Sequence, residues 1–381
     1  MLDHPQKLSK QLISSLFSRA ETDLNGFDFN PVGSGQVGDC YRVNLNWRDV
    51  KNSPVSFIAK CPAEDSSSRD TARNLHLYEI EVSFYQLLSS RCSARVPELY
   101  FSEYDKKTSD GVLLLEDMYP AKQIPHMDGC SSNEVSMVLR EAAALHKSYW
   151  NDETLLTYPW LTYGISEERK KFAAELLPAV YPEWKRRYQG RISNDIFKMG
   201  DTLLANYEKY ADVQEGPMTL VQGDLRLDNL LFTDKNNRAI LLDWQTAAVG
   251  LPLNDVAYCI STSFQDPKER AKEEENLVKE YYDLLKVNDS YAFEQACDDY
   301  RRASFVGFLM AVLSAMIVER TDRGDEMFAG YPWRYYRAIS STNFEDYIDK
   351  YYQFWQRLID NRDIKKVFQP IWSCLLYTSP S

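Results

Sequence analysis

The side chains best suited to chemistry lie in the stretch "LVQGDLRLDNLLF", residues 220–232. Val221 before the polar residues and the Leu-Leu-Phe segment after them are typical of the buried faces of short strands. Asp224 and Asn229 are therefore expected on a tight connection between two rigid elements. Functional side chains concentrate on such connections, because the flanking elements fix their positions.

Asp243 is the third polar residue of this group, fourteen positions after Asn229 and directly after the apolar segment "AILL". Phosphoryl transfer needs a carboxylate that accepts the proton of the acceptor hydroxyl, and oxygen ligands that hold Mg²⁺ against the phosphates. Asp224 suits the first role, and Asn229 and Asp243 suit the second. The alternative for any one of these residues is an ordinary turn-forming Asp or Asn.

Gly33, Gly35 and Gly38 form a G-x-G-x-x-G pattern. The residues that follow, "DCYRVNLNW", alternate as a strand does, so the loop joins two strands rather than the strand and helix of a Rossmann site. A glycine-rich hairpin lets backbone N–H groups approach phosphate oxygens. A plain hairpin turn is the alternative.

Lys60 lies near the end of the apolar segment "PVSFIAKCP". A lysine at a strand end usually extends to solvent, which is one interpretation. Below a phosphate-covering loop it would instead neutralise phosphate charge, and it would then need a carboxylate partner. Glu81 is the best candidate and Glu79 its rival; on a helix the two point about 200° apart, so only one can face the lobe interior.

The composition is that of a globular protein large enough for two lobes: 381 residues, 44% hydrophobic and 26% charged. The net charge of −12 argues against nucleic acid or an anionic membrane as a partner. Seven cysteines without a C-x-x-C pair are typical of reduced thiols. The N-terminus has no signal-like apolar core, and the apolar run at 305–318 is too short to span a bilayer, so a cytoplasmic location is expected.

The order of elements predicts an α+β protein. By residue 117 the sequence has three strands, a helix over 66–90 and two further strands; beyond it, helices dominate, at 131–150, 166–209, 268–285, 290–318 and 344–359. We therefore expect a small antiparallel β-rich N-lobe with one main helix (1–117) and a larger, mostly helical C-lobe (118–372). The final "SCLLYTSPS", residues 373–381, has no continuity with what precedes it and is expected to be a non-native tail.

As a set, these motifs resemble those of the aminoglycoside phosphotransferase and choline kinase superfamily, and more closely its ecdysteroid-kinase-like (CHK kinase-like) branch. "QGDLRLDNLLF" is similar to the family's H-G-D-x-x-x-x-N loop, and "LLDWQ" to its metal-binding strand end. "FYQLL" resembles the family's E-x-x-F-Y helix, "LLLEDM" its connector, and "GLPLNDVAY" the segment after the metal site. The similarity extends from about residue 32 to residue 258.

The resemblance implies a protein-kinase-like two-lobe fold and the transfer of phosphate from ATP, with Mg²⁺, to a hydroxyl group of a small molecule. It implies that Asp224 is the catalytic base and that Asn229 and Asp243 are the magnesium ligands. The E-x-x-F-Y match favours Glu81 over Glu79, and Asp255 is implied to brace the catalytic loop. The nucleotide-binding residues that the resemblance implies are Gly33, Gly35, Gly38, Lys60, Glu81, Glu116 and Met118.

Gln222 is the clear departure, because the family's loop usually begins with His. The Gln amide can donate and accept hydrogen bonds as neutral imidazole does, so we expect activity to be retained. A protein kinase is a poorer match, because only eleven residues separate Asp243 from Asp255 and Gly223 replaces the arginine of the H-R-D loop. The alternative function is a nucleotide-binding pseudokinase that acts as a scaffold.

Overall fold

The computed structural model describes residues 2–33, 38–49, 53–163, 167–212, 216–234, 237–287 and 290–317. Gly35, the helix predicted at 344–359 and the tail predicted at 373–381 lie outside these residues. By compactness the chain divides into two units, Met1–Gly164 with Pro217–Val306, and Ile165–Gly216 with Gly307–Ser381. The lobe boundary predicted at residue 117 lies within the first unit and stays a prediction.

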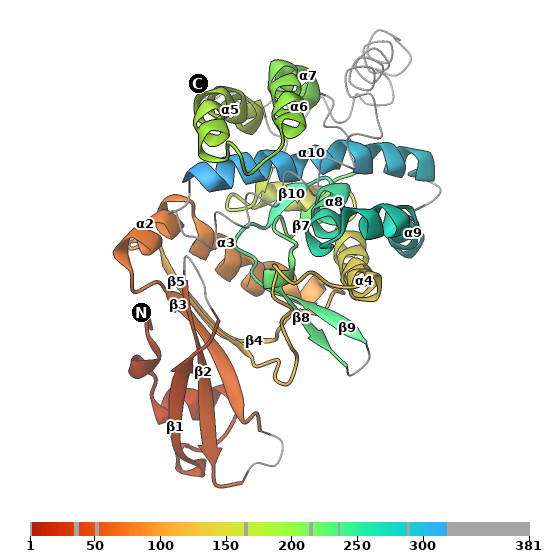
Figure 1. Cartoon of the computed structure of the whole chain (residues 1–381). Coiled ribbons are helices and arrows are strands. Elements are labelled where there is room, and N and C mark those ends of the chain that lie inside the picture. Colours follow the sequence, from red (N-terminus) through yellow and green to blue (C-terminus); the bar gives the residue numbers. More distant parts are fainter. Residues whose placement is uncertain are drawn as a thin grey trace. The chain divides into compact units, whose positions relative to one another are not determined.

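An antiparallel sheet forms the N-terminal part of the first unit, with the strand order β1-β2-β3-β5-β4 (Figure 1). Its strands are β1 (Leu24–Pro31), β2 (Gly38–Trp47), β3 (Ser56–Pro62), β4 (Leu99–Asp105) and β5 (Asp110–Glu116). Three short segments precede it, η1 (Pro5–Lys7), α1 (Lys10–Leu16) and η2 (Glu21–Asp23). The five strand regions predicted from the sequence are thus present.

The inner strand β5 is apolar along most of its length because both of its faces are buried. Val112 and Leu114 belong to a core cluster with residues of α1 and of the outer strands. Leu113 and Leu115 belong to a second, larger cluster. The sheet therefore separates two cores, and a helix must cover its second face.

The helix predicted over residues 66–90 is divided into α2 (Ser66–Asn74) and α3 (Leu77–Ser83), which continues into a π-helical turn, η3 (Phe84–Leu88), and η4 (Ser89–Arg91). His76, between α2 and α3, has a φ of +57°. α2 has no apolar stripe to bury; instead its Arg69 and Arg73 both bind Asp110 at the start of β5, at 2.7 Å. The left-handed residue allows α2 to make this contact while α3 packs against β5.

The rest of the first unit contains short strands, three long helices and the first part of a fourth, α10 (Phe293–Ile317). The strands are β6 (Thr162–Tyr163), β7 (Thr219–Val221), β8 (Leu230–Thr233), β9 (Arg238–Leu241) and β10 (Ala248–Gly250), and the helices are α4 (Ser132–Ser148), α8 (Pro252–Ser263) and α9 (Pro267–Leu285), with η5 (Glu153–Thr157) and η6 (Leu227–Asn229). A capping box between Ser131 and Glu134 begins α4. α4 packs against both α8 and α9, and the larger core cluster joins these helices to α3 and β5.

The second unit is helical in the residues that the structure describes. It contains α5 (Glu167–Arg187), α6 (Asn194–Ala205), α7 (Tyr207–Asp212) and the end of α10 (Phe293–Ile317). The fully buried indole of Trp184 packs at its centre against the rings of Tyr181, Phe197 and Phe308. Across the described ranges, no helix is long and apolar enough to cross a membrane.

Candidate active site

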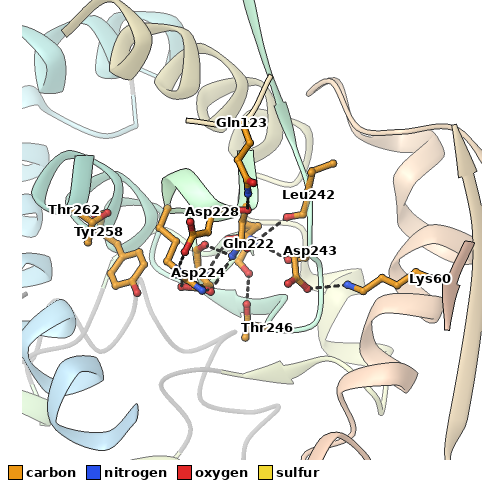
Figure 2. A network of polar contacts seen from close by, with 12 residues as sticks. Lys60, Gln123, Gln222, Asp224, Asp228, Leu242, Asp243, Thr246, Tyr258 and Thr262 are labelled. Atoms are coloured by element: carbon orange, nitrogen blue, oxygen red, sulfur yellow. Dashed lines mark hydrogen bonds and ion pairs between the residues drawn. The ribbon is translucent and has the colours of Figure 1, made fainter. Parts of the chain in front are cut away.

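Lys60, Glu81 and Asp243 form a charged cluster from three separate elements, namely β3, α3 and the segment after β9. Lys60 Nζ lies 2.7 Å from Glu81 Oε2 and 3.2 Å from Asp243 Oδ1, the second contact being drawn in Figure 2. Glu79, the rival candidate, instead lies beside His76, at 3.5 Å. The Lys60–Glu81 ion pair expected from the sequence is therefore formed.

The charge of Lys60 is stabilised by the two carboxylates. Burial lowers the pKa of the Lys60 ammonium, but the charges of Asp243 and Glu81 outweigh that effect and raise this pKa above its ordinary value. Burial raises the pKa of Glu81, an effect that the charge of Lys60 opposes. Lys60 is therefore a cation at neutral pH. It could exchange one carboxylate for an anion that carries more charge.

The helix that carries Glu81 is also fixed to the segment that carries Asp243. Glu81 Oε1 accepts a hydrogen bond from the Trp244 backbone N–H at 3.3 Å. The Trp244 indole stacks on Phe84, with ring centroids 3.7 Å apart and planes 9° from parallel. These contacts couple the position of α3 to that of Asp243.

Asp224 and Asn229 lie on the connection between β7 and β8, as the sequence predicts. Asn229 Nδ2 donates to the Asp224 backbone carbonyl at 2.9 Å and to Asp224 Oδ2 at 2.8 Å. Asn229 is buried, whereas the Asp224 side chain is 24% exposed and thus within reach of a substrate. The Asn229 amide nitrogen is therefore held by the loop, and Oδ1 is the atom that the predicted role of a magnesium ligand would use.

Gln222 links the loop that carries Asp224 and Asn229 to the segment that carries Asp243. Its Oε1 accepts from the Asp224 backbone N–H at 2.7 Å, and its Nε2 donates to the carbonyls of Leu242 and Asp243, at 3.1 and 2.6 Å (Figure 2). Asp243 has a φ of +57°, a conformation that costs free energy for a residue other than glycine. The Gln222 amide thus holds the backbone on both sides of a strained residue.

Asp255, on α8, braces the loop from the other side. Its carboxylate accepts from the backbone N–H groups of Gln222 and Gly223, at 2.7 and 2.9 Å. The fully buried His146 lies 3.3 Å from Asp255 through Nε2. This arrangement fits the bracing role expected for Asp255.

Gly223 is required by the geometry of this loop. Its φ is +85°, and a Cβ at this position would lie 2.5 Å from the Thr246 carbonyl oxygen. No real Cβ approaches an oxygen so closely, so an arginine like that of the H-R-D loop does not fit here.

The connector, which begins at the last residue of β5, carries Glu116 and Met118. The Glu116 N–H donates to the Glu98 carbonyl, and the Met118 carbonyl accepts from the Ala121 N–H, both at 2.8 Å. Arg95 binds the Glu116 carboxylate with contacts of 2.7 and 2.8 Å. These bonds fix the backbone of the connector.

Two arginines important to this region were not identified from the sequence. Arg226 donates from Nε to both oxygens of Asp224 and from Nη1 to Asp228 Oδ2, at 2.7 Å. The alternation in "DLRLD", which places three charged residues at every second position, is the signal that could have identified it. Arg95 is separated from its partner Glu116 by 21 positions and has no such local signal.

The donor set fits a magnesium ion. Asn229 Oδ1 and the Asp243 carboxylate are hard oxygen donors, and Mg²⁺ commonly binds one or two protein oxygens while phosphates and waters complete its shell. Among the described residues, no group of three or more His, Cys, Asp or Glu side chains could hold a metal.

The chain belongs to the ecdysteroid kinase-like family, whose sequence profile matches residues 33–290. This match confirms the resemblance identified from the motifs. It covers the glycine hairpin, Lys60, Glu81, the catalytic loop and Asp243.

Solved structures of two kinds of phosphotransferase share the fold. An ethanolamine kinase of Plasmodium vivax superposes with a TM-score of 0.50 at 13% identity, covering 84% of each chain. The GDP and kanamycin complex of an aminoglycoside 2″-phosphotransferase superposes with a TM-score of 0.52 at 10% identity, covering 87% of this chain and 98% of the other. The two-lobe, kinase-like fold predicted from the sequence is thereby confirmed.

Curated relatives match over a shorter stretch. Acyl-CoA dehydrogenase family member 11 of Gallus gallus is 36% identical over 84 residues, which is 21% of this chain and 10% of that protein. The Homo sapiens protein of the same name is 34% identical over 79 residues, 20% of this chain and 10% of that protein. The matched part of the chain thus spans about a tenth of the length of these relatives.

Proposed function

We propose that this protein is an ATP- and Mg²⁺-dependent kinase that phosphorylates a hydroxyl group of a small molecule. The observation that carries the proposal is the convergence of three elements on one site. Lys60 contacts Asp243, and Gln222 joins the Asp243 backbone to that of Asp224. The residues that we propose as phosphate-side cation, metal ligand and base are thus connected through direct contacts, which supports phosphoryl transfer.

Membership of a kinase-like family supports the proposal. Similar folds occur in an ethanolamine kinase and in an aminoglycoside phosphotransferase that was solved with GDP and kanamycin. Those proteins point to a nucleotide and a small hydroxylated acceptor as the class of ligands for this chain.

The nucleotide would lie between the glycine hairpin of Gly33, Gly35 and Gly38 and the connector. Because one polar backbone atom of each connector residue is already hydrogen-bonded, we assign the Glu116 carbonyl and the Met118 N–H to the adenine. Lys60, held by Glu81, binds phosphate oxygens. Mg²⁺, held by Asn229 and Asp243, would neutralise phosphate charge when bound.

In the reaction, the acceptor hydroxyl oxygen forms a bond to the γ-phosphorus of ATP. The bond between that phosphorus and the oxygen bridging to the β-phosphate breaks, and ADP leaves with the electron pair. Asp224 positions the hydroxyl and takes its proton. Gln222 and Asp255 act by positioning, since they hold the loop backbone and do not meet the reacting atoms.

The test separates the base from the metal ligand. Asp224→Asn keeps the shape of the side chain but removes the base, so kcat should fall by roughly 10²–10⁴ while Mg·ATP affinity changes little. Asp243→Asn removes a charged ligand and a partner of Lys60, so it should weaken Mg·ATP binding as well as turnover. Calorimetric titration with Mg·ATP, with ATP consumption on a panel of hydroxylated amines, sterols and aminoglycosides, measures both.

Two outcomes would contradict this assignment. Normal turnover by Asp224→Asn would remove Asp224 as the base. Binding of Mg·ATP by the wild type, without phosphorylation of any compound on a broad panel, would favour the nucleotide-binding scaffold over the kinase.

A further inference from the structure

The base proposed for this reaction is held by an arginine of its own loop. Arg226 Nε lies 3.1 Å from Asp224 Oδ1 and 3.0 Å from Asp224 Oδ2, and Asn229 Nδ2 lies 2.8 Å from the same Oδ2. Both carboxylate oxygens therefore accept hydrogen bonds before any substrate arrives. Oδ1 accepts one bond and Oδ2 two, so a hydroxyl that gives its proton to Asp224 meets Oδ1 and competes with the guanidinium for that carboxylate.

The same guanidinium is anchored on its far side. Arg226 Nη1 binds Asp228 Oδ2 at 2.7 Å. The guanidinium charge therefore lies between the carboxylates of Asp224 and Asp228. The side chains of Arg226 and Asp224 are both partly exposed, at 19% and 24%. The guanidinium can therefore turn away from Asp224 and keep Asp228 as its partner.

Phosphoryl transfer places a strongly anionic group beside this arginine. The hydroxyl bound to Asp224 attacks phosphorus directly, so the transferred group lies one bond length beyond the hydroxyl oxygen and close to the Asp224 carboxylate. The planar guanidinium fork matches phosphate oxygens better than an ammonium does. Lys60 reaches the phosphates from β3, whereas Arg226 is on the same loop as the base.

We propose that Arg226 is a second phosphate-binding cation of the site, which leaves Asp224 when the acceptor hydroxyl binds and then contacts the transferred phosphoryl group. The exchange frees the base and brings a positive charge to the γ-phosphate oxygens in one movement. This inference rests on the proposed kinase function. It assigns Arg226 a contact that grows as the phosphoryl group transfers and that contributes little to binding of ADP.

A binding experiment tests this role without knowledge of the acceptor. Affinity for Mg·ADP is measured by calorimetry with and without aluminium fluoride, which mimics a phosphoryl group in transfer while a water molecule takes the place of the acceptor hydroxyl at Asp224. For the wild type, the fluoride should tighten binding by about 10²-fold. Arg226→Gln should lose about 10–100-fold of that gain, the effect of one charged hydrogen-bonding partner, with Mg·ADP affinity almost unchanged. Arg226→Lys should retain an intermediate gain, since it keeps the charge without the fork.

Arg238→Gln is the matched control. Arg238 also forms a double contact with a carboxylate, at 2.7 and 2.8 Å from Glu141, but it lies on β9 outside the proposed site. This variant should bind Mg·ADP, with and without aluminium fluoride, as the wild type does.

Three results would overturn the role of Arg226: an Arg226→Gln variant that keeps the full gain, one that loses affinity for Mg·ADP itself, or a wild type with no gain although it binds Mg·ADP. The last result would leave the proposed function standing. Failure of the wild type to bind Mg·ADP at all would instead contradict the proposed function.

Discussion

Gln222 combines three hydrogen bonds in one neutral side chain. It connects the Asp224 N–H with the carbonyls of Leu242 and Asp243, and it is fully buried. A neutral imidazole at this position can donate one hydrogen bond and accept one, so it can replace two of the three bonds. Gln222, which replaces the family's usual His, therefore preserves the link between the Asp224 loop and the segment that carries Asp243.

We predict that Gln222→His keeps kcat/KM for ATP within about tenfold of the wild type, because one lost hydrogen bond is worth about 1 kcal/mol. Gln222→Ala, which loses all three bonds, should be impaired much more. The His variant should also lose activity as the pH falls through about 6.5, because imidazolium cannot accept from the Asp224 N–H. Rate measurements from pH 5 to 8 on both variants and the wild type test this prediction.

A rise in kcat/KM far above tenfold for Gln222→His would show that the glutamine impairs the natural protein. Equal activity of the Ala and His variants would show that the side chain does not position the loop.

The ion pair of Lys60 with Glu81 was predictable from the sequence, because the pattern that identifies the acid spans only a few neighbouring residues. Helical spacing excludes Glu79 and Glu81 from facing the same side, and the resemblance to the family's E-x-x-F-Y helix favours Glu81. Arg226 was not identified, because its role depends on where the Asp224 carboxylate points after the loop has folded. The alternation in "DLRLD" groups Arg226 with two acids, but it does not tell which carboxylate oxygens the guanidinium meets.

The loop between β7 and β8 depends on a left-handed glycine that is also crowded. Gly33 has a similar conformation, with φ of +78°, but a Cβ there would have no neighbour within 4 Å, whereas at Gly223 it would lie 2.5 Å from the Thr246 carbonyl oxygen. Both residues are in the first compact unit. Comparing them separates the cost of the backbone conformation from the cost of the clash.

We predict that Gly33→Ala lowers the free energy of unfolding by about 1 kcal/mol, the cost of a left-handed residue with a side chain. Gly223→Ala should lower it by a further 1–3 kcal/mol or so, because the Thr246 backbone must move. Urea unfolding followed by tryptophan fluorescence measures both values without ligand. Equal losses for the two variants would indicate that the loop accommodates a Cβ without resistance.

The division of the predicted helix at His76 was not predictable from spacing alone. Residues 66–90 have helical composition throughout, and nothing local marks residue 76 as left-handed. The break becomes necessary only because Arg69 and Arg73 bind Asp110, at the start of β5 and 37 to 41 positions away. Long-range contacts of this kind override local propensity.

At the scale of the whole molecule, Asp110 affects how the protein responds to acid. Burial raises the pKa of its carboxyl, but hydrogen bonds from Arg69 and Arg73 outweigh burial and lower this pKa from 3.8 to about 2. The folded state therefore favours the charged form more than the unfolded state does. The resulting stability is present above about pH 4 and is lost as the pH falls towards 2.

We predict that Asp110→Asn lowers the free energy of unfolding at pH 7 by about 2 kcal/mol. The difference in this free energy between the variant and the wild type should narrow between about pH 4 and pH 2. Asp70→Asn is the control, because Asp70 is an exposed partner of the same Arg73, at 3.4 Å, and should change stability by less than about 0.5 kcal/mol. Urea midpoints across this pH range test the prediction. A difference that stays constant with pH would contradict the role of the Asp110 charge.

The predicted fold class followed from the strand and helix patterns, whereas the two compact units did not. Gly164 precedes residues 165–216 and Gly216-Pro217 ends them, but such residues mark ordinary turns as often as the end of a compact unit. Compactness is decided by contacts between distant segments, such as the packing of Trp184 on Phe308. A single sequence gives no periodic signal for such contacts.

The order in which the elements appear along the chain has a consequence for synthesis on the ribosome. The strands of the N-terminal sheet are complete by Glu116, so the sheet can form while the rest of the chain is still being made. Lys60 and Asp243 are 183 positions apart, and residues 165–216 must be translated between them. At translation rates of about 5–20 residues per second, Asp243 is synthesised roughly 10–40 s after Lys60, so Lys60 lacks this partner for that time. During that time Glu81 is the nearby acid already available to pair with it, so the ion pair within the sheet and its helix can protect the nascent lobe before the active site exists.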